Sequence, residues 1–99
     1  MKLKVKKSLV RGEYHLNFQT VGFNDEETEK INKFGSPKID FSSDGLGEHG
    51  IEKLDIYLKA DSQQEANELI ERIQNKIKEK LGELLSKMDN FSGEEVIEI

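Results

Sequence analysis

The strongest constraint on the fold is a long amphipathic helix, which we predict between Ser62 and Met88. Its apolar residues recur every three or four positions and are Ile70, Ile73, Ile77, Leu81, Leu84 and Met88. The first and last of these are 18 positions apart, which over five turns gives 3.6 residues per turn. Such a stripe stays on one side of a straight helix, whereas a strict 3.5-residue repeat would indicate a coiled coil. The pattern therefore predicts a helix that lies on a broad surface such as a β-sheet.

Four segments alternate apolar and polar residues, which is typical of strands with one buried face. They span residues 2–10, 14–19, 38–41 and 53–59. Because Arg11 and Gly12 separate the first two segments, we predict a hairpin there. We expect the fourth segment to pair antiparallel with the third. Lys7 interrupts the apolar face of the first segment, which indicates a sheet edge or a bend at that position.

Both predicted helices begin with a capping box, in which a polar side chain and a glutamate three residues later each bond the other's backbone. Asn24 and Glu27 form the first box. The short helix after it should end at Gly35, because glycine readily adopts the left-handed conformation of a helix C-cap. Ser62 and Glu65 form the second box and begin the long helix. Both helix starts are therefore determined by local sequence.

These elements predict one α+β domain that spans residues 1–99. The expected order is ββαββα, or ββαββα(β) if Glu95–Ile99 forms a last short strand. Since every predicted strand has one apolar face, we expect a two-layer sandwich. It would have four or five antiparallel strands in one sheet, with the short and the long helix on one face. Gly82 within the long helix indicates a kink, a close approach to the sheet, or neither.

Composition restricts the size of the core and the location of the protein. The chain has 99 residues, of which 34% are hydrophobic and 35% charged, so one core is expected. It has no cysteine, which fits a reducing compartment. It has no apolar run near the ~20 residues of a membrane span, and no apolar stretch follows the basic first residues as in a signal peptide. We expect a cytoplasmic protein without membrane association.

Charge is distributed unevenly along the chain. The net charge of −5 argues against general nucleic-acid binding, yet residues 1–11 carry basic side chains and no acidic ones. If the strands pair as expected, their polar face presents a candidate binding surface of Lys4, Lys6, His15, Tyr57 and Lys59. A basic sheet face with an aromatic residue is one way of binding single-stranded RNA. We keep this as an alternative function, with a solvated charged face as the simpler interpretation.

The end of the third predicted strand and the loop after it contain the candidate metal ligands Asp40, Asp44, Glu48 and His49. Asp40, Ser42 and Asp44 with Gly45 resemble the first half of an EF-hand calcium loop. However, the twelfth position is Ile51 and the flanking segments are predicted strands, so turn formation explains these residues as well. A metal- or ligand-binding protein or enzyme that uses this loop is the second alternative. We expect no catalytic residues and no cofactor, because no nucleophile–base set or nucleotide-binding motif is present.

The acidic C-terminal segment suggests a role for the basic first strand. Glu94, Glu95 and Glu98 surround an apolar pair, whereas Lys2, Lys4 and Lys6 alternate along the first strand. Opposite charges on neighbouring strands stabilise their pairing. We therefore expect residues 94–99 to add to the sheet edge within the chain or across a dimer, unless they are a frayed terminus. The function expected from the sequence is a small non-enzymatic protein-interaction or assembly module that self-associates, with a homodimer or a protein partner.

Overall fold

The computed structural model describes residues 1–91 and 94–98, and it describes side chains for residues 1–87 and 94–98. The protein is α+β, with antiparallel strands and two α-helices. In chain order the elements are β1 (Lys2–Val10), β2 (Glu13–Val21), α1 (Asp25–Phe34), β3 (Lys38–Asp40), a 3-10 turn η1 (Ser42–Asp44), β4 (Glu48–Gly50), β5 (Asp55–Ala60) and α2 (Gln63–Phe91).

A tight turn joins β1 and β2 into the hairpin that the sequence predicts. Both turn residues have positive φ, 52° at Arg11 and 80° at Gly12. Two such residues form the kind of two-residue turn whose twist matches that of the flanking strands. Pairing then continues without a break from Val10 opposite Glu13 to the far end of the hairpin. Because the turn depends on two adjacent residues, the sequence alone was enough to predict it.

The main sheet has three strands in the order β1-β2-β5. β5 pairs antiparallel with β2, so that Leu16 lies opposite Leu58 and Phe18 opposite Ile56. These pairs make one continuous apolar face. The expected pairing of this segment with the third predicted strand is wrong, because β3 pairs with β4 instead.

β3, which lies within the third predicted strand, and β4, which lies in the expected loop, form a second, two-stranded sheet. The Phe41 N–H donates to the Gly47 carbonyl at 2.7 Å, and the Leu46 N–H donates to Phe41 at 3.1 Å. Phe41 therefore follows β3 instead of belonging to it. Closing so short a loop costs little entropy, which favours this local pairing over addition to the main sheet. The single sheet of four or five strands is thus replaced by sheets of three and two strands.

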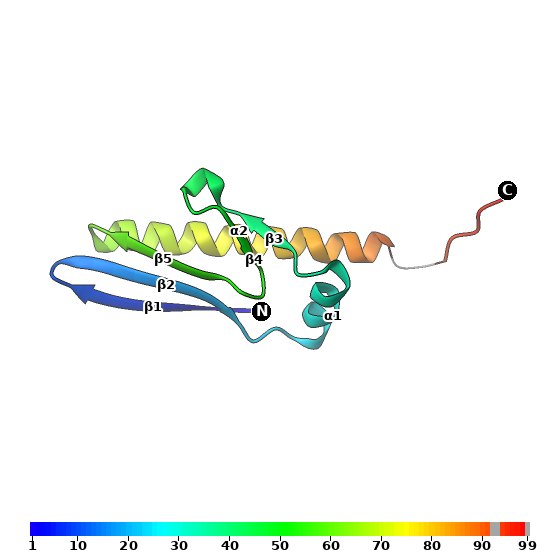
Figure 1. Ribbon diagram of the computed structural model, residues 1–99, viewed down its shortest axis with the longest axis horizontal. Helices are drawn as coiled ribbons and strands as arrows, with labels where there is room; N and C mark the ends of the chain where they lie inside the picture. Colours follow the sequence, from blue (N-terminus) through cyan, green and yellow to red (C-terminus); the bar gives the residue numbers. More distant parts are fainter. Residues whose placement is uncertain (92–93, 99) are drawn as a thin grey trace.

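α2 lies along the apolar face of the main sheet and also contacts β3 (Figure 1). The predicted stripe is confirmed at Ile73, Ile77, Leu81 and Leu84, which are buried, while Ile70 is half-buried. The Met88 side chain lies outside the described residues. The buried apolar core is contributed by both sheets and both helices. It consists of Leu16, Phe18, Ile31, Ile39, Phe41, Ile51, Leu54, Ile56, Ala60, Ala66, Ile73, Ile77, Leu81 and Leu84.

α1 lies beyond the end of the main sheet, where it packs against α2 (Figure 1). The sequence instead predicts this helix beside α2 on the face of the sheet. Its capping box is confirmed: the Asn24 side chain accepts from the Glu27 N–H at 2.8 Å, and Glu27 accepts from the Asn24 N–H at 3.0 Å. The helix ends at Gly35, whose φ of 68° is left-handed.

Residues 94–98 form neither helix nor strand and are exposed. The expected strand at Glu95–Ile99 is therefore not formed over residues 95–98, and Ile99 lies outside the described residues. The sequence predicts that the long helix ends at Asp89–Asn90, but α2 continues to Phe91. Figure 1 shows this segment beyond the end of α2, pointing away from β1. Within the described part of the chain, no helix is both long enough and apolar enough to cross a bilayer.

Candidate functional site: the open edge of the β1 strand

β1 has nine residues and pairs with β2 along one side, while no described strand pairs with its other side. Backbone hydrogen bonds alternate between the two sides of an edge strand. Because Val10 and Glu13 flank a two-residue turn, they form a hydrogen-bonded pair, and every second residue from Val10 also bonds β2. The residues whose backbone N–H and C=O groups point outward are therefore Leu3, Val5, Lys7 and Leu9.

This edge is strongly basic. Lys2, Lys4 and Lys6 project from the outer face of the sheet, and Lys7 projects from the apolar face. Among the described side chains, no carboxylate lies within 4.0 Å of any of these four ammonium groups. A row of lysines, with one on the inward side, is how natural edge strands resist unwanted pairing. The interruption that Lys7 makes in the sequence pattern does mark a sheet edge.

α2 leaves the apolar side of β1 partly uncovered. Leu3 and Val5 are half-buried, and Leu9 is 62% exposed. Two hollows, of about 360 and 410 Å³, open between β1 or its hairpin and α2. Their linings include Leu3, Leu9, Tyr14, Ala66, Ile77 and Leu81. The sheet edge therefore offers free backbone groups beside apolar surface.

All five residues of the predicted binding surface lie on the outer face of the main sheet. His15 Nδ1 hydrogen-bonds the Tyr57 hydroxyl, and the Glu13 carboxylate lies 3.7 Å from both His15 Nε2 and Lys59 Nζ. Tyr57 is 52% exposed beside this cluster. The remaining two residues of the predicted surface, Lys4 and Lys6, belong to the basic edge. The strand register thus brings the predicted residues together, while their binding role stays a prediction.

Three of the four metal-ligand candidates, Asp40, Asp44 and His49, make structural contacts around η1 and β4. Asp44 lies 3.0 Å from Lys76 Nζ and 3.6 Å from Arg72 Nη1, which ties η1 to α2. Asp40 accepts hydrogen bonds from Ser42, and these bonds, with the charge of nearby lysines, lower the pKa of its carboxyl. These two carboxylates therefore already have partners within the protein.

Glu48 and His49 do not complete a metal site with them. Glu48 is exposed across the small sheet from Asp40. His49 Nε2 lies 2.8 Å from the Leu46 carbonyl oxygen, and its ring meets the Phe41 ring edge-on at 5.9 Å. Among the side chains that the structure describes, in residues 1–87 and 94–98, no three from His, Asp or Glu come close enough to hold a metal. The metal hypothesis gains no support from this arrangement.

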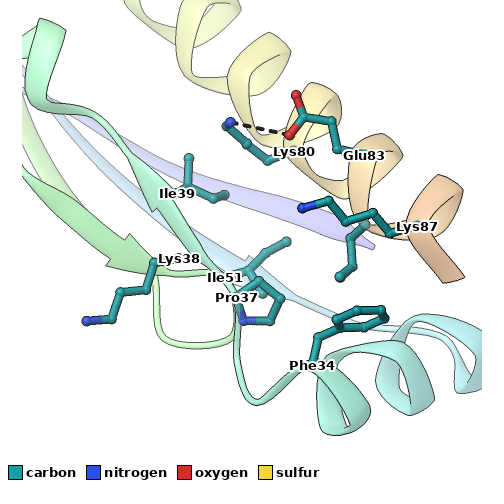
Figure 2. A pocket seen from close by; sticks show the side chains of 9 residues that line it. Phe34, Pro37, Lys38, Ile39, Ile51, Lys80, Glu83 and Lys87 are labelled. Atoms are coloured by element: carbon teal, nitrogen blue, oxygen red, sulfur yellow. Dashed lines mark hydrogen bonds and ion pairs between the residues drawn. The ribbon is translucent and has the colours of Figure 1, made fainter. Parts of the chain in front are cut away.

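Sequence reasoning missed a pocket of about 310 Å³ between α1, β3 and α2 (Figure 2). Its walls are apolar at Pro37, Ile39 and Ile51, and Phe34 beside them is 41% exposed. Lys80 and Lys87 from α2 line the opposite side, where Lys80 Nζ lies 3.3 Å from the Glu83 carboxylate. The residues are Phe34, Pro37, Lys38, Ile39, Ile51, Lys80, Glu83, Leu84 and Lys87. Lys80, Glu83, Leu84 and Lys87 are spaced so that they share one face of α2, and this spacing is visible in the sequence. The opposite wall comes from residues 34–51, whose position beside α2 depends on the tertiary structure.

No protein-family model, curated protein or solved structure matches the chain. The basic edge of β1 therefore has to be interpreted from its own geometry.

Proposed function

We propose that the protein is a small non-enzymatic interaction module that binds an extended segment of a protein partner as an additional strand along β1. The observation that carries this proposal is the open nine-residue edge, with outward backbone groups at Leu3, Val5, Lys7 and Leu9. Strand addition derives affinity from main-chain hydrogen bonds and specificity from alternate side chains. β1 offers both, because its lysines and its apolar residues alternate.

The side chains of β1 define the chemistry of the partner. Four lysines select an acidic segment, since each opposite-charge pair across strands contributes about 0.2–1 kcal/mol. The half-buried Leu3 and Val5 and the hollows beside them favour apolar side chains at alternate positions. The preferred partner is thus an extended segment with acidic and apolar residues.

The alternative functions have less support. For single-stranded RNA, Tyr57 is the aromatic residue available on the outer face, and it already bonds His15. For metal or ligand chemistry in the loop, Asp44 is engaged by two cationic side chains of α2. A cytoplasmic location accompanies the interaction function as an expectation from composition.

Strand addition can be tested with a synthetic nine-residue peptide of alternating glutamate and valine. When the peptide is added to the full chain, we expect the amides of Leu3, Val5, Lys7 and Leu9 to exchange hydrogen at least about tenfold more slowly. The reason is that these amides would acquire carbonyl partners. The measurement is residue-resolved hydrogen exchange by NMR.

Two controls make this test specific. The same peptide, N-methylated at alternate residues, cannot form the ladder and should protect no amide. Lys7→Pro removes one outward N–H without removing a bond to β2, and it should abolish binding, whereas Lys7→Gln keeps that N–H and should retain it. Protection on the outer face at His15 and Tyr57, with the β1 amides unchanged, would contradict the proposal.

A further inference from the structure

We infer that the strand bound along β1 is residues 94–98 of a second copy of this chain, so that the protein assembles head to tail. This inference rests on the proposed strand-addition function and names its partner. Residues 94–98 are exposed, and Val96 and Ile97 are 84% and 73% exposed. β-branched residues favour a strand, and here they lie outside any sheet. The segment has the acidic and apolar character that β1 selects.

An antiparallel register matches the two segments residue by residue. With Ile97 opposite Val5, Glu95 lies opposite Lys7 and Glu98 opposite Lys4. Since side chains alternate between faces, Ile97 then enters the partly uncovered apolar side of β1, between the two hollows. Glu95 on that same side meets Lys7, the charge that interrupts the apolar face. One register thus pairs two charges and extends the apolar surface.

The competing arrangements are poorer. A parallel register with the same apolar pair would also bring Glu94 and Glu98 opposite Lys2 and Lys6 on the outer face. On the apolar side, however, it would put the charge of Glu95 against Leu3 and the apolar Ile99 against Lys7. Pairing of β1 with another β1 would bring two rows of lysines together, which like-charge repulsion opposes. Pairing within one chain is disfavoured because the segment extends from the end of α2 away from its own β1 (Figure 1). The remaining candidate for the added strand is the acidic segment of a second copy.

The direction of the elements makes the assembly open. β1 and α2 run in opposite directions, and residues 94–98 continue beyond the end of α2 (Figure 1). A segment that continues along its own helix axis is therefore antiparallel to the β1 strand of a neighbour in the same orientation. Each contact leaves one β1 edge and one acidic segment free. Such a heterologous contact forms chains of increasing length instead of a closed dimer.

The experiment uses a donor-only and an acceptor-only variant of the full domain. Lys7→Pro keeps the acidic segment but blocks the edge, and deletion of residues 94–99 keeps the edge but removes the segment. By light scattering, the wild-type mass should rise beyond two copies with concentration. Each variant alone should be monomeric, and an equimolar mixture should stop at a 1:1 dimer.

A charge swap tests the register and serves if Lys7→Pro does not fold. Lys7→Glu with the segment deleted, or Glu95→Lys with an intact edge, should each weaken association several-fold against unchanged partners. Mixing the two reversed chains should restore it. A donor–acceptor mixture that remains monomeric, or a reversed pair that is no tighter than either single reversal, overturns the inference.

The two proposals fail in different ways. If the β1 amides become protected by the glutamate–valine peptide but the donor–acceptor mixture stays monomeric, strand addition stands and residues 94–98 are not the strand. The same holds if deletion of residues 94–99 leaves the wild-type mass unchanged while Lys7→Pro makes the protein monomeric. If neither the peptide nor a second copy protects β1, both proposals are wrong.

Discussion

Glu27 is a buried carboxylate at the first turn of α1, where it bonds the Asn24 N–H and the amino group of Met1. Burial by itself would raise the pKa of this carboxyl. The hydrogen bonds from Met1 and Asn24, together with the positive charge of the amino group, outweigh burial and lower the pKa below its usual 4.5. One side chain thus joins the start of β1 to the start of α1.

The lowered pKa predicts how stability changes with pH. A carboxyl with a depressed folded-state pKa contributes stability that is present above the unfolded-state pKa and is lost as pH falls through the folded-state value. Glu27→Gln should therefore cost about 1 to 2 kcal/mol at pH 7 and progressively less below about pH 4.5. Urea unfolding between about pH 3 and 7 measures this difference.

Glu29→Gln is the matched control on the same helix. Glu29 is exposed and pairs with Lys33 at 3.4 Å, so its loss should change stability by less than about 0.5 kcal/mol at any pH. If Glu27→Gln and Glu29→Gln gave parallel pH profiles, the role assigned to Glu27 would be wrong.

At the level of single elements, Gly82 within α2 and Gly35 at the end of α1 differ in backbone conformation. A Cβ built at Gly82 in α2 would meet no atom within 4 Å, and its φ is not positive. The sequence left open whether this glycine marks a kink, a close approach or neither, and the free space excludes a close approach. Gly35 also has free space, but its φ of 68° is left-handed.

The same substitution should therefore have opposite signs at these positions. Gly82→Ala should stabilise the protein by about 0.5–1 kcal/mol, because alanine costs less backbone entropy in a helix. Gly35→Ala should destabilise it by about 1 kcal/mol, because the left-handed conformation strains a residue with a Cβ. Thermal or urea unfolding of the two variants checks this, and equal signs would contradict it.

At the scale of the whole molecule, the charges that define the basic edge also control assembly. Electrostatic screening shortens from about 10 Å at ~0.1 M salt to about 3 Å at ~1 M. Association between β1 and residues 94–98 should therefore weaken several-fold over that range of sodium chloride, as measured by the light-scattering mass at fixed protein concentration. Replacing Glu94, Glu95 and Glu98 with glutamine should remove most of this dependence. An association that strengthens with salt would indicate an apolar contact, such as the pocket beside Phe34.

A buried hydrogen bond links the three-stranded sheet to the residue that follows the small sheet. The Thr20 hydroxyl at the end of β2 donates to the Ile51 carbonyl at 2.6 Å, and the Ile51 N–H donates to Pro37 at 2.9 Å. Ile51 thus connects β2 to the segment before β3. The sequence pattern did not single out this contact, because it joins residues 31 positions apart.

Local sequence was enough to predict the Arg11–Gly12 turn, the capping box at Asn24 and the apolar stripe of α2. At Ser62 the predicted box is confirmed in part: the Ser62 hydroxyl accepts from the Glu65 N–H at 3.1 Å, but the Glu65 carboxylate accepts from the Asp61 N–H. Each of these features depends on residues within a few positions of one another, so their chemistry is complete in a short window. The sequence also determined which strand residues share a face, because strand periodicity is two. Because every apolar strand face turns toward the core, the five residues of the candidate binding surface share the outer face, although the expected pairing of residues 53–59 is wrong.

Strand pairing, in contrast, depends on packing across the whole molecule. The segment of β5 has the same alternation whether it meets β2 or β3, so the pattern cannot choose between them. The choice depends on how Leu58 and Ile56 meet Leu16 and Phe18 beneath α2, and on the low cost of closing β3 onto β4. The same global packing leaves β1 at an edge and residues 94–98 away from it. The interaction surface is therefore a product of the fold, although its charges are evident in the sequence.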